Sequence, residues 1–154
     1  MAGKIETKLV AMGFALPDAP KPAANYVPYV QVGDIVYVSG QISVDAQGLI
    51  IGKLGDTMTV EQGQAAARAC ALNLLAQVRA ACGGDLDRLV RVVKLGGFVN
   101  STPDFKDHPK VINGASDFIG EALGAVGAHA RAAVGCASLP LGVAVEIEGV
   151  FQVK

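Results

Sequence analysis

The sequence is poor in aromatic and charged residues and has no tryptophan. Aromatic residues make up 5% of the 154 residues, and charged residues make up 18%. Glycine and charged residues interrupt every apolar stretch before it reaches the about 20 residues that cross a bilayer. The first residues also lack the apolar segment of a secretory signal. We therefore predict no membrane-spanning helix and expect a cytoplasmic protein.

Cysteine is scarce, and its spacing argues against two kinds of cross-linked domain. Cys70, Cys82 and Cys136 form an odd set without any C-x-x-C pair. Neither a disulfide scaffold nor a zinc knuckle is therefore expected, and a reducing compartment suits free thiols. We interpret all three as small core residues rather than nucleophiles, the first two on a helix and the third on a strand.

Motifs that hold phosphates or catalytic metals are also missing. There is no G-x-G-x-x-G after a strand, no G-x-x-x-x-G-K-[ST] and no H-E-x-x-H. His108, His129 and the scattered carboxylates give no spacing for a metal site. The net charge is -1, and basic residues do not cluster with aromatic ones. This charge distribution argues against an RNA-binding surface.

Apolar residues, in contrast, are abundant. Hydrophobic residues make up 51% of the chain. A chain of this length forms one ordinary domain with a core, but a monomer would leave much apolar surface in water. Contact between copies of the chain would bury that surface, so we expect an oligomer.

Two segments carry the clearest helical pattern. Over residues 60–82, apolar residues recur at helical spacing behind Thr59 and Gln62, which form a capping box. A second helix is predicted over residues 109–123. Its inward face should carry Val111, Ile112, Ala115, Phe118, Ile119 and Ala122. Residues 4–12 predict a short amphipathic helix as well.

Strand signals surround these helices. Residues 26–31 and 35–40 flank the turn Gly33-Asp34 and predict a β-hairpin. Pro28 cannot donate a backbone hydrogen bond, so it places the first strand of the hairpin at a sheet edge.

Further β segments follow the hairpin. Residues 42–44 are expected to continue its sheet, and residues 89–99 to form a long strand. Gly96-Gly97 inside that strand predicts a bulge or a close backbone approach. A last pair of strands flanks the connection at residues 139–142.

The order of these elements predicts the fold class. A β-hairpin, a helix, a strand, a helix and two strands contain the strand–helix–strand unit twice. This order favours an α+β sandwich with a mixed, mostly antiparallel sheet and both helices on one face. We expect a single domain over residues 1–154, with an N-terminal extension over 1–24 and a core over 25–154.

Arg131, Glu146 and Glu148 are charged residues inside otherwise apolar strands. Such charges are costly to bury unless they are paired or used. If the last two strands are neighbours, Arg131 and Glu146 reach the same end of a cleft. There the guanidinium would suit a carboxylate, and the glutamate would activate a water. A structural ion pair in a subunit interface explains both residues equally well. If the two side chains lie in separate surroundings, the proposed chemistry loses its support.

Tyr29, Ser39 and Gly40 form a second group of candidates. A Ser-Gly pair that closes a strand can present a hydroxyl and a backbone N–H group to a ligand, but an ordinary strand end is the more common explanation of such a pair. Ser39 has no G-x-S-x-G frame, and no known triad pattern places His108 or His129 beside it.

An ordered set of short motifs resembles the RidA/YjgF/UK114 family. The set comprises Pro28-Tyr29-Val30-Gln31, Val38-Ser39-Gly40-Gln41-Ile42, Val93-Lys94 ahead of Phe98-Val99, Arg131 with Leu139-Pro140, and Val145-Glu146-Ile147-Glu148. Each motif alone is weak, but their order is specific. The resemblance implies a chorismate-mutase-like fold of the bacillar type and a homotrimer with clefts between its subunits.

The resemblance also implies an activity. Family members that keep the arginine hydrolyse reactive enamine and imine acids, such as 2-aminoacrylate and its imine tautomer, to 2-keto acids and ammonia, without a metal or organic cofactor. By this resemblance, Arg131 would grip the substrate carboxylate and Glu146 would position or activate the attacking water. The cleft would be lined by Tyr29, Ser39, Gly40, Ala133 and Asn113.

The chain departs from the family pattern in three places. Ala133 stands where the family often has cysteine, and both the segment before Asn25 and the region 114–129 are longer than usual. These features resemble a divergent branch with a different substrate. A non-catalytic trimer that binds a carboxylate ligand through Arg131 is therefore an alternative. An endoribonuclease, the other activity ascribed to relatives, is disfavoured by the near-neutral charge.

Overall fold

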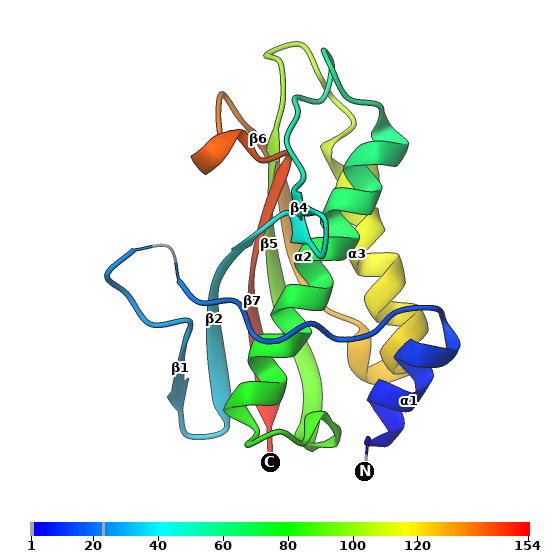
Figure 1. Ribbon diagram of the computed structural model, residues 1–154, viewed down its shortest axis with the longest axis vertical. Coiled ribbons are helices and arrows are strands. Elements are labelled where there is room, and N and C mark those ends of the chain that lie inside the picture. Colours follow the sequence, from blue (N-terminus) through cyan, green and yellow to red (C-terminus); the bar gives the residue numbers. More distant parts are fainter. Residues whose placement is uncertain (1, 23) are drawn as a thin grey trace.

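A five-stranded sheet and two long helices make up the body of the protein, as the computed structural model shows for residues 2–22 and 24–154 (Figure 1). The helices are α1 (Lys4–Ala11), α2 (Val60–Ala81) and α3 (His108–Leu123), with short 3-10 turns η1 (Leu86–Arg88), η2 (Gly124–Gly127) and η3 (Pro140–Gly142). The strands are β1 (Tyr29–Val32), β2 (Ile35–Ile42), β3 (Val44–Asp45), β4 (Gly48–Leu49), β5 (Leu89–Asn100), β6 (Ala130–Cys136) and β7 (Val145–Val153).

The main sheet is mixed, with the strand order β1-β2-β7-β5-β6. β5 and β6 are parallel, whereas the other three neighbouring pairs are antiparallel. Because β7 runs antiparallel to both β2 and β5, those two strands share one direction. Each helix therefore connects parallel strands, α2 from β2 to β5 and α3 from β5 to β6. The predicted α+β class, with α2 and α3 on one face of the sheet, is confirmed (Figure 1).

The helices form where the periodicity predicts them. Thr59 and Gln62 make the expected capping box at the start of α2. The buried residues of α3 are the six predicted from its periodicity. A Cβ atom on Gly114 would lie only 2.6 Å from Cα of Gln64, so this glycine lets α3 pack directly on the backbone of α2. No helix in the described part of the chain is long and apolar enough to span a bilayer.

Two expectations about the strands need correction. Residues 42–44 continue the main sheet only in part, because Ile42 ends β2 and pairs with Glu146, whereas Val44 belongs to β3, which pairs with β4 in a separate two-stranded sheet. The last two strands, β6 and β7, are not neighbours, because β5 lies between them. β6 is parallel to β5, and a parallel pair needs a crossover connection, which α3 supplies. β6 thus lies beside β5 at the edge of the sheet.

Gly96 and Gly97 lie where neighbouring side chains approach the backbone of β5 closely, and the strand has no bulge there. The register of β5 against β7 shifts near its start, between Leu89 and Arg91 and between Val92 and Lys94, but not at the glycines. A Cβ atom on Gly97 would lie 2.7 Å from the Ile112 side chain of α3. Glycine at this position therefore lets α3 lie close to the sheet.

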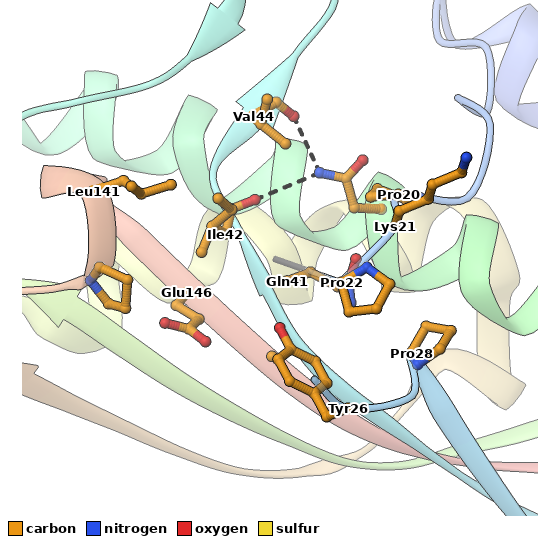
Figure 2. Close-up of a pocket in the computed structure, with 13 residues that line it drawn as sticks. Pro20, Lys21, Pro22, Tyr26, Pro28, Gln41, Ile42, Val44, Leu141 and Glu146 are labelled. Carbon is orange, nitrogen blue, oxygen red and sulfur yellow. Dashed lines mark hydrogen bonds between the residues drawn. The ribbon is translucent and has the colours of Figure 1, made fainter. Parts of the chain in front are cut away.

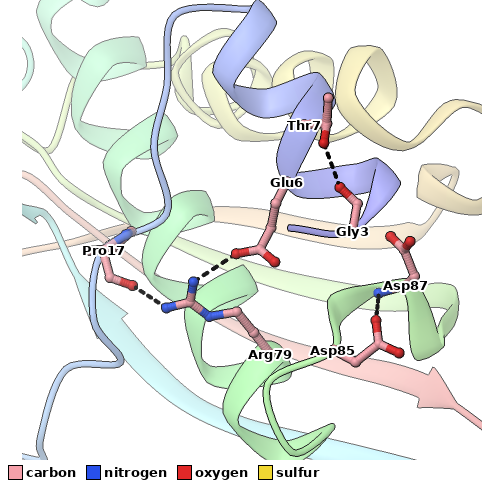
Figure 3. A network of polar contacts seen from close by, with 7 residues as sticks. All are labelled: Gly3, Glu6, Thr7, Pro17, Arg79, Asp85 and Asp87. Carbon is pink, nitrogen blue, oxygen red and sulfur yellow. Dashed lines mark hydrogen bonds and ion pairs between the residues drawn. The ribbon is translucent and has the colours of Figure 1, made fainter. Parts of the chain in front are cut away.

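The N-terminal segment packs against the body of the protein (Figure 3). Leu9 of α1 is fully buried in the core. Arg79 of α2 pairs with Glu6 at 2.7 Å and donates to the carbonyl of Pro17 at 3.1 Å. Asp87 of η1 accepts hydrogen bonds from the first backbone N–H groups of α1. Polar contacts at both ends thus hold α1 and the chain that follows it in place.

Candidate active site in two halves

Arg131 and Glu146 lie on opposite faces of the main sheet. Arg131 of β6 pairs with Leu95, which is buried under the helices, and its side chain reaches α3. Glu146 of β7 alternates with fully buried Val145 and Ile147, so its side chain leaves the sheet on the face away from the helices, here called the open face. The prediction that both side chains reach one end of a cleft within one chain is therefore wrong, because β5 separates their strands. The two groups lie in separate surroundings, so one chain alone gives the predicted chemistry no support.

Neutral oxygen atoms surround the Arg131 guanidinium. Nη1 donates to Oδ1 of Asn113 at 2.8 Å and to Oγ of Ser116 at 3.1 Å, and Nη2 donates to the carbonyl of Pro109 at 3.4 Å. All three partners belong to α3. The side chain is half-buried, and Arg131 lines a shallow pocket together with Ser116 and His129. A half-buried guanidinium fixed by uncharged acceptors keeps its charge available for an anion.

Glu146 faces a separate pocket of about 250 Å³ (Figure 2). Tyr26, Pro22 and Pro28 line the opposite side of this pocket, which is largely apolar. Burial raises the pKa of the Glu146 carboxyl, and the nearby charge of Glu148 raises it further. A raised pKa makes the carboxylate a stronger base toward a water molecule.

Of the candidates Tyr29, Ser39 and Gly40, only Gly40 lines this pocket. Gly40 lies against Glu146, because a Cβ atom there would overlap the carboxylate. Ser39 does not face the pocket, since its hydroxyl donates to the carbonyl of Val27 at 2.8 Å and so fixes the chain before β1. Tyr29 packs against the core, and Tyr26, which the motifs did not single out, lines the pocket instead.

The other candidates accompany Arg131. Asn113 holds the guanidinium from α3, and Ala133 lies two residues along β6, so its side chain shares the face of Arg131. Ala133 is half-buried and packs against the core. The candidates therefore form two half-sites: Arg131, Asn113 and Ala133 on the helix side of β6, and Glu146 and Gly40 on the open face.

Neither charged group has an ionic partner in residues 2–22 and 24–154. The ion pairs in this part of the chain join Arg79 to Glu6 and Lys110 to Asp107. A closed Arg131–Glu146 ion pair within one chain is thus excluded, whereas the alternative of an ion pair in a subunit interface stays a prediction.

Ser116 and His129 were not recognised from the sequence as part of the Arg131 half-site. They lie 2.9 Å apart, between Oγ and Nε2, while His108 bonds Ser101. Neither histidine therefore approaches Ser39. Their spacing could have indicated them. Ser116 follows Asn113 by three residues on a helix, and His129, just before β6, precedes Arg131 by two residues.

Comparison with known proteins identifies the family. The family model described as YjgF/chorismate mutase-like, which carries an endoribonuclease label, matches residues 6–148. The chain belongs to this family. Protein TCP17 from Trypanosoma cruzi is 50% identical to the chain over 155 residues, which cover 99% of the chain and 96% of that protein. The resemblance seen in the motifs of β1, β2, β6 and β7 is therefore confirmed.

Two further family members bear on structure and activity. The crystal structure of Atu1372, a protein of unknown function from Agrobacterium tumefaciens, is 47% identical with a TM-score of 0.91, covering 97% of this chain and 92% of that one. The 2-iminobutanoate/2-iminopropanoate deaminase of Dermatophagoides farinae is 29% identical over 140 residues, which cover 90% of this chain and 93% of that protein. The fold is thus shared closely with the first, and a named enzyme activity occurs in the second.

Proposed function

We propose that this protein hydrolyses reactive 2-imino and enamine acids to 2-keto acids and ammonia, in clefts between the subunits of a homotrimer. Arg131 binds the substrate carboxylate, and Glu146 of an adjacent copy positions the attacking water. The observation that carries this proposal is a pair of incomplete half-sites on opposite faces of one sheet: among the described residues, the Arg131 guanidinium has no carboxylate partner and the Glu146 carboxylate has no cationic partner.

The chemistry follows from the two groups. The Arg131 fork binds a planar carboxylate through two parallel hydrogen bonds, and Asn113 fixes its orientation. Water adds to the carbon of the protonated imine while Glu146 accepts one water proton, which gives a carbinolamine with a neutral amine. Glu146 returns this proton to the amine nitrogen, the C–N bond breaks, and the hydroxyl group becomes the keto group as its proton leaves with ammonia. The raised pKa of Glu146 suits it to accept and then return the proton.

The apolar character of the open face supports the requirement for a second copy. Val30, Val32, Tyr37 and Val134 lie on the strands of the main sheet and are each about half exposed or more. The helices α2 and α3 cover the other face (Figure 1). Exposed apolar residues on the same face of the sheet as Glu146 favour contact with another chain. A neighbouring chain on this face would bring its own Arg131 toward Glu146.

The activity is tested with a freshly generated 2-imino acid. An amino-acid oxidase supplies the imino acid, and the appearance of keto acid and ammonia is followed with and without the protein. We expect wild-type protein to accelerate both, and Arg131→Ala to lose this acceleration while keeping its oligomeric state. Absence of any acceleration by the wild type would leave a carboxylate-binding protein. Unchanged activity in Arg131→Ala would remove that residue from the mechanism.

A complementation experiment tests whether two copies build one site. Arg131→Ala and Glu146→Gln chains are each expected to be inactive alone. Co-expressed chains that assemble at random in a ring would restore about a quarter of the sites, because some interfaces join the intact half of each variant. No recovery in verified mixed assemblies would contradict a site shared between copies.

A further inference from the structure

Ser116, His129 and Arg131 form a continuous hydrogen-bonded chain on the helix side of β6. Oγ of Ser116 lies 2.9 Å from Nε2 of His129 and 3.1 Å from Nη1 of Arg131. Nδ1 of His129 lies 2.6 Å from the carbonyl oxygen of Gly127. All three side chains line the same shallow pocket.

These distances define the proton positions in the neutral imidazole. A carbonyl oxygen can only accept, so Nδ1 of His129 carries the proton that it donates to Gly127. Nε2 is then an acceptor and receives the hydroxyl proton of Ser116. A serine that donates to an oriented histidine is the arrangement of a nucleophile and its general base. The Gly127 carbonyl occupies the place that a carboxylate takes in a Ser-His-Asp triad.

Arg131 adds a positive charge beside the Ser116 oxygen. Its Nη1 donates to Oγ, so the negative charge that develops on the carbonyl oxygen of an ester attacked by Ser116 would form close to the guanidinium. Glycines make up much of the remaining pocket wall, at positions 120, 124 and 127. Without side chains at these positions, a small ligand can reach both Ser116 and Arg131.

We propose that Ser116 and His129 form a nucleophile–base pair that gives this protein a second activity, the hydrolysis of small acyl esters bearing a carboxylate. Arg131 attracts the acidic group, Oγ of Ser116 attacks the ester carbonyl, and His129 takes the hydroxyl proton. The bond to the alcohol breaks, and the alcohol leaves with the proton returned by His129. Water then cleaves the acyl-serine, which releases the acid and restores the serine. The reaction shares Arg131 with the proposed imine chemistry but does not use Glu146.

A second serine–histidine pair provides a matched control within the same chain. Ser101 lies 3.1 Å from Nε2 of His108, a distance similar to that of the Ser116 pair. Ser101 is only 5% exposed, and no guanidinium contacts it among the described residues. Its surroundings are closed, because Gly135 packs directly against both members of the pair. The Ser101 pair should therefore be unreactive.

The test uses 4-nitrophenyl hydrogen succinate, an activated ester with a free carboxylate, and 4-nitrophenyl acetate, which lacks one. We expect a rapid burst of nitrophenolate approaching one equivalent per chain with the first ester, and peptide mass spectrometry should locate the succinyl group on Ser116. Ser116→Ala should abolish the burst, and Ser101→Ala should retain it. His129→Gln keeps a hydrogen-bonding group near Ser116 but removes the base, and should slow acylation by on the order of a hundredfold. Circular dichroism confirms that each variant is folded.

Further outcomes separate this proposal from the deaminase. Glu146→Gln should keep the succinyl burst while losing imine hydrolysis, and Arg131→Ala should lose the preference for succinate over acetate. A wild-type protein without a burst, a burst that persists in Ser116→Ala, or acylation confined to surface lysines would overturn the proposal. None of these results depends on whether the imine assay succeeds.

Discussion

Arg131 and Asn113 are joined by a hydrogen bond of 2.8 Å between Nη1 and Oδ1, which fixes the guanidinium from the helix that covers the sheet. The acceptor is an amide rather than a carboxylate. A carboxylate at this position would neutralise Arg131 and compete with a bound acid, whereas the amide only orients it. This contact therefore explains how a half-buried arginine can be held rigidly and still keep its charge for a ligand.

Replacement of Asn113 tests this role. In Asn113→Asp, the new carboxylate should pair with Arg131, and kcat/KM for the imino acid should fall on the order of a hundredfold. In Asn113→Ala, orientation is lost but the charge remains, so KM should rise about tenfold with a smaller change in kcat. Steady-state kinetics of both variants distinguish charge competition from loss of orientation.

A nearby amide provides the control for these variants. Gln64 of α2 donates to the carbonyl of Lys110 at 2.9 Å and so also bonds α3, but it does not contact Arg131. Gln64→Ala should leave the kinetics close to those of the wild type. Equal losses in Asn113→Asp and Asn113→Ala would contradict the argument, because then the charge of the new residue would have no effect.

The arrangement of the layers was predictable from local pattern. The capping box of Thr59 and Gln62, and the buried positions of α3 at helical spacing, fix each helix independently of distant residues. Two strand–helix–strand units then leave few topologies. The end of β2 was not predictable in this way, because pairing of β3 with β4 instead of β7 depends on contacts that no short window of sequence contains.

The site was predictable as a set of residues but not as an arrangement. The motifs drew attention to Arg131 and Glu146, yet strand alternation does not say which strand lies between theirs. The parallel pairing of β5 with β6 places β5 there and assigns the two residues to opposite faces. Ser116 and His129 carried no family motif, and only the fold brings them together.

The raised pKa of Glu146 predicts a shifted acid limb in the pH profile. Because burial is its main cause, kcat/KM should fall with decreasing pH at a higher pH than for an ordinary glutamate. Glu148 is the second cause, so Glu148→Gln should move this limb toward lower pH. Glu121→Gln, on α3, removes the same charge elsewhere and should leave the limb in place. The pH dependence of kcat/KM for the three proteins measures the effect.

The pH dependence of the unfolding free energy is a second measurement of the raised pKa of Glu146. The pKa of Glu146 is higher in the folded than in the unfolded state, so its contribution to stability is present below the unfolded pKa and is lost as pH rises through the folded pKa. Glu146→Gln cannot ionise and should flatten this part of the curve of unfolding free energy against pH. A decline of the same size in Glu146→Gln would show that other groups cause it.

The contacts of Asp87 predict the opposite pH dependence for the stability of α1. Its two carboxylate oxygens accept from the backbone N–H groups of Lys4 at 2.7 Å and Ile5 at 3.0 Å, and these hydrogen bonds lower its pKa. A lowered folded pKa contributes stability that is present above the unfolded pKa and is lost as pH falls through the folded value. The protection factors of the α1 amides, which allow for the intrinsic slowing of exchange in acid, should therefore fall as the pH falls through the folded pKa.

Substitution at Asp87 should reproduce this loss at neutral pH. Asp87→Ala removes both acceptors, so the α1 amides should exchange about tenfold faster, as expected for loss of a helix cap. Asp85→Ala is the matched control, because Asp85 accepts from the backbone N–H of Asp87 at 3.1 Å and caps η1 instead. This substitution leaves both hydrogen bonds from α1 to Asp87 in place. If both variants accelerate hydrogen exchange in α1 equally, the backbone geometry of η1 holds α1 in place. If only Asp87→Ala accelerates it, the Asp87 carboxylate holds α1, as the two short hydrogen bonds indicate.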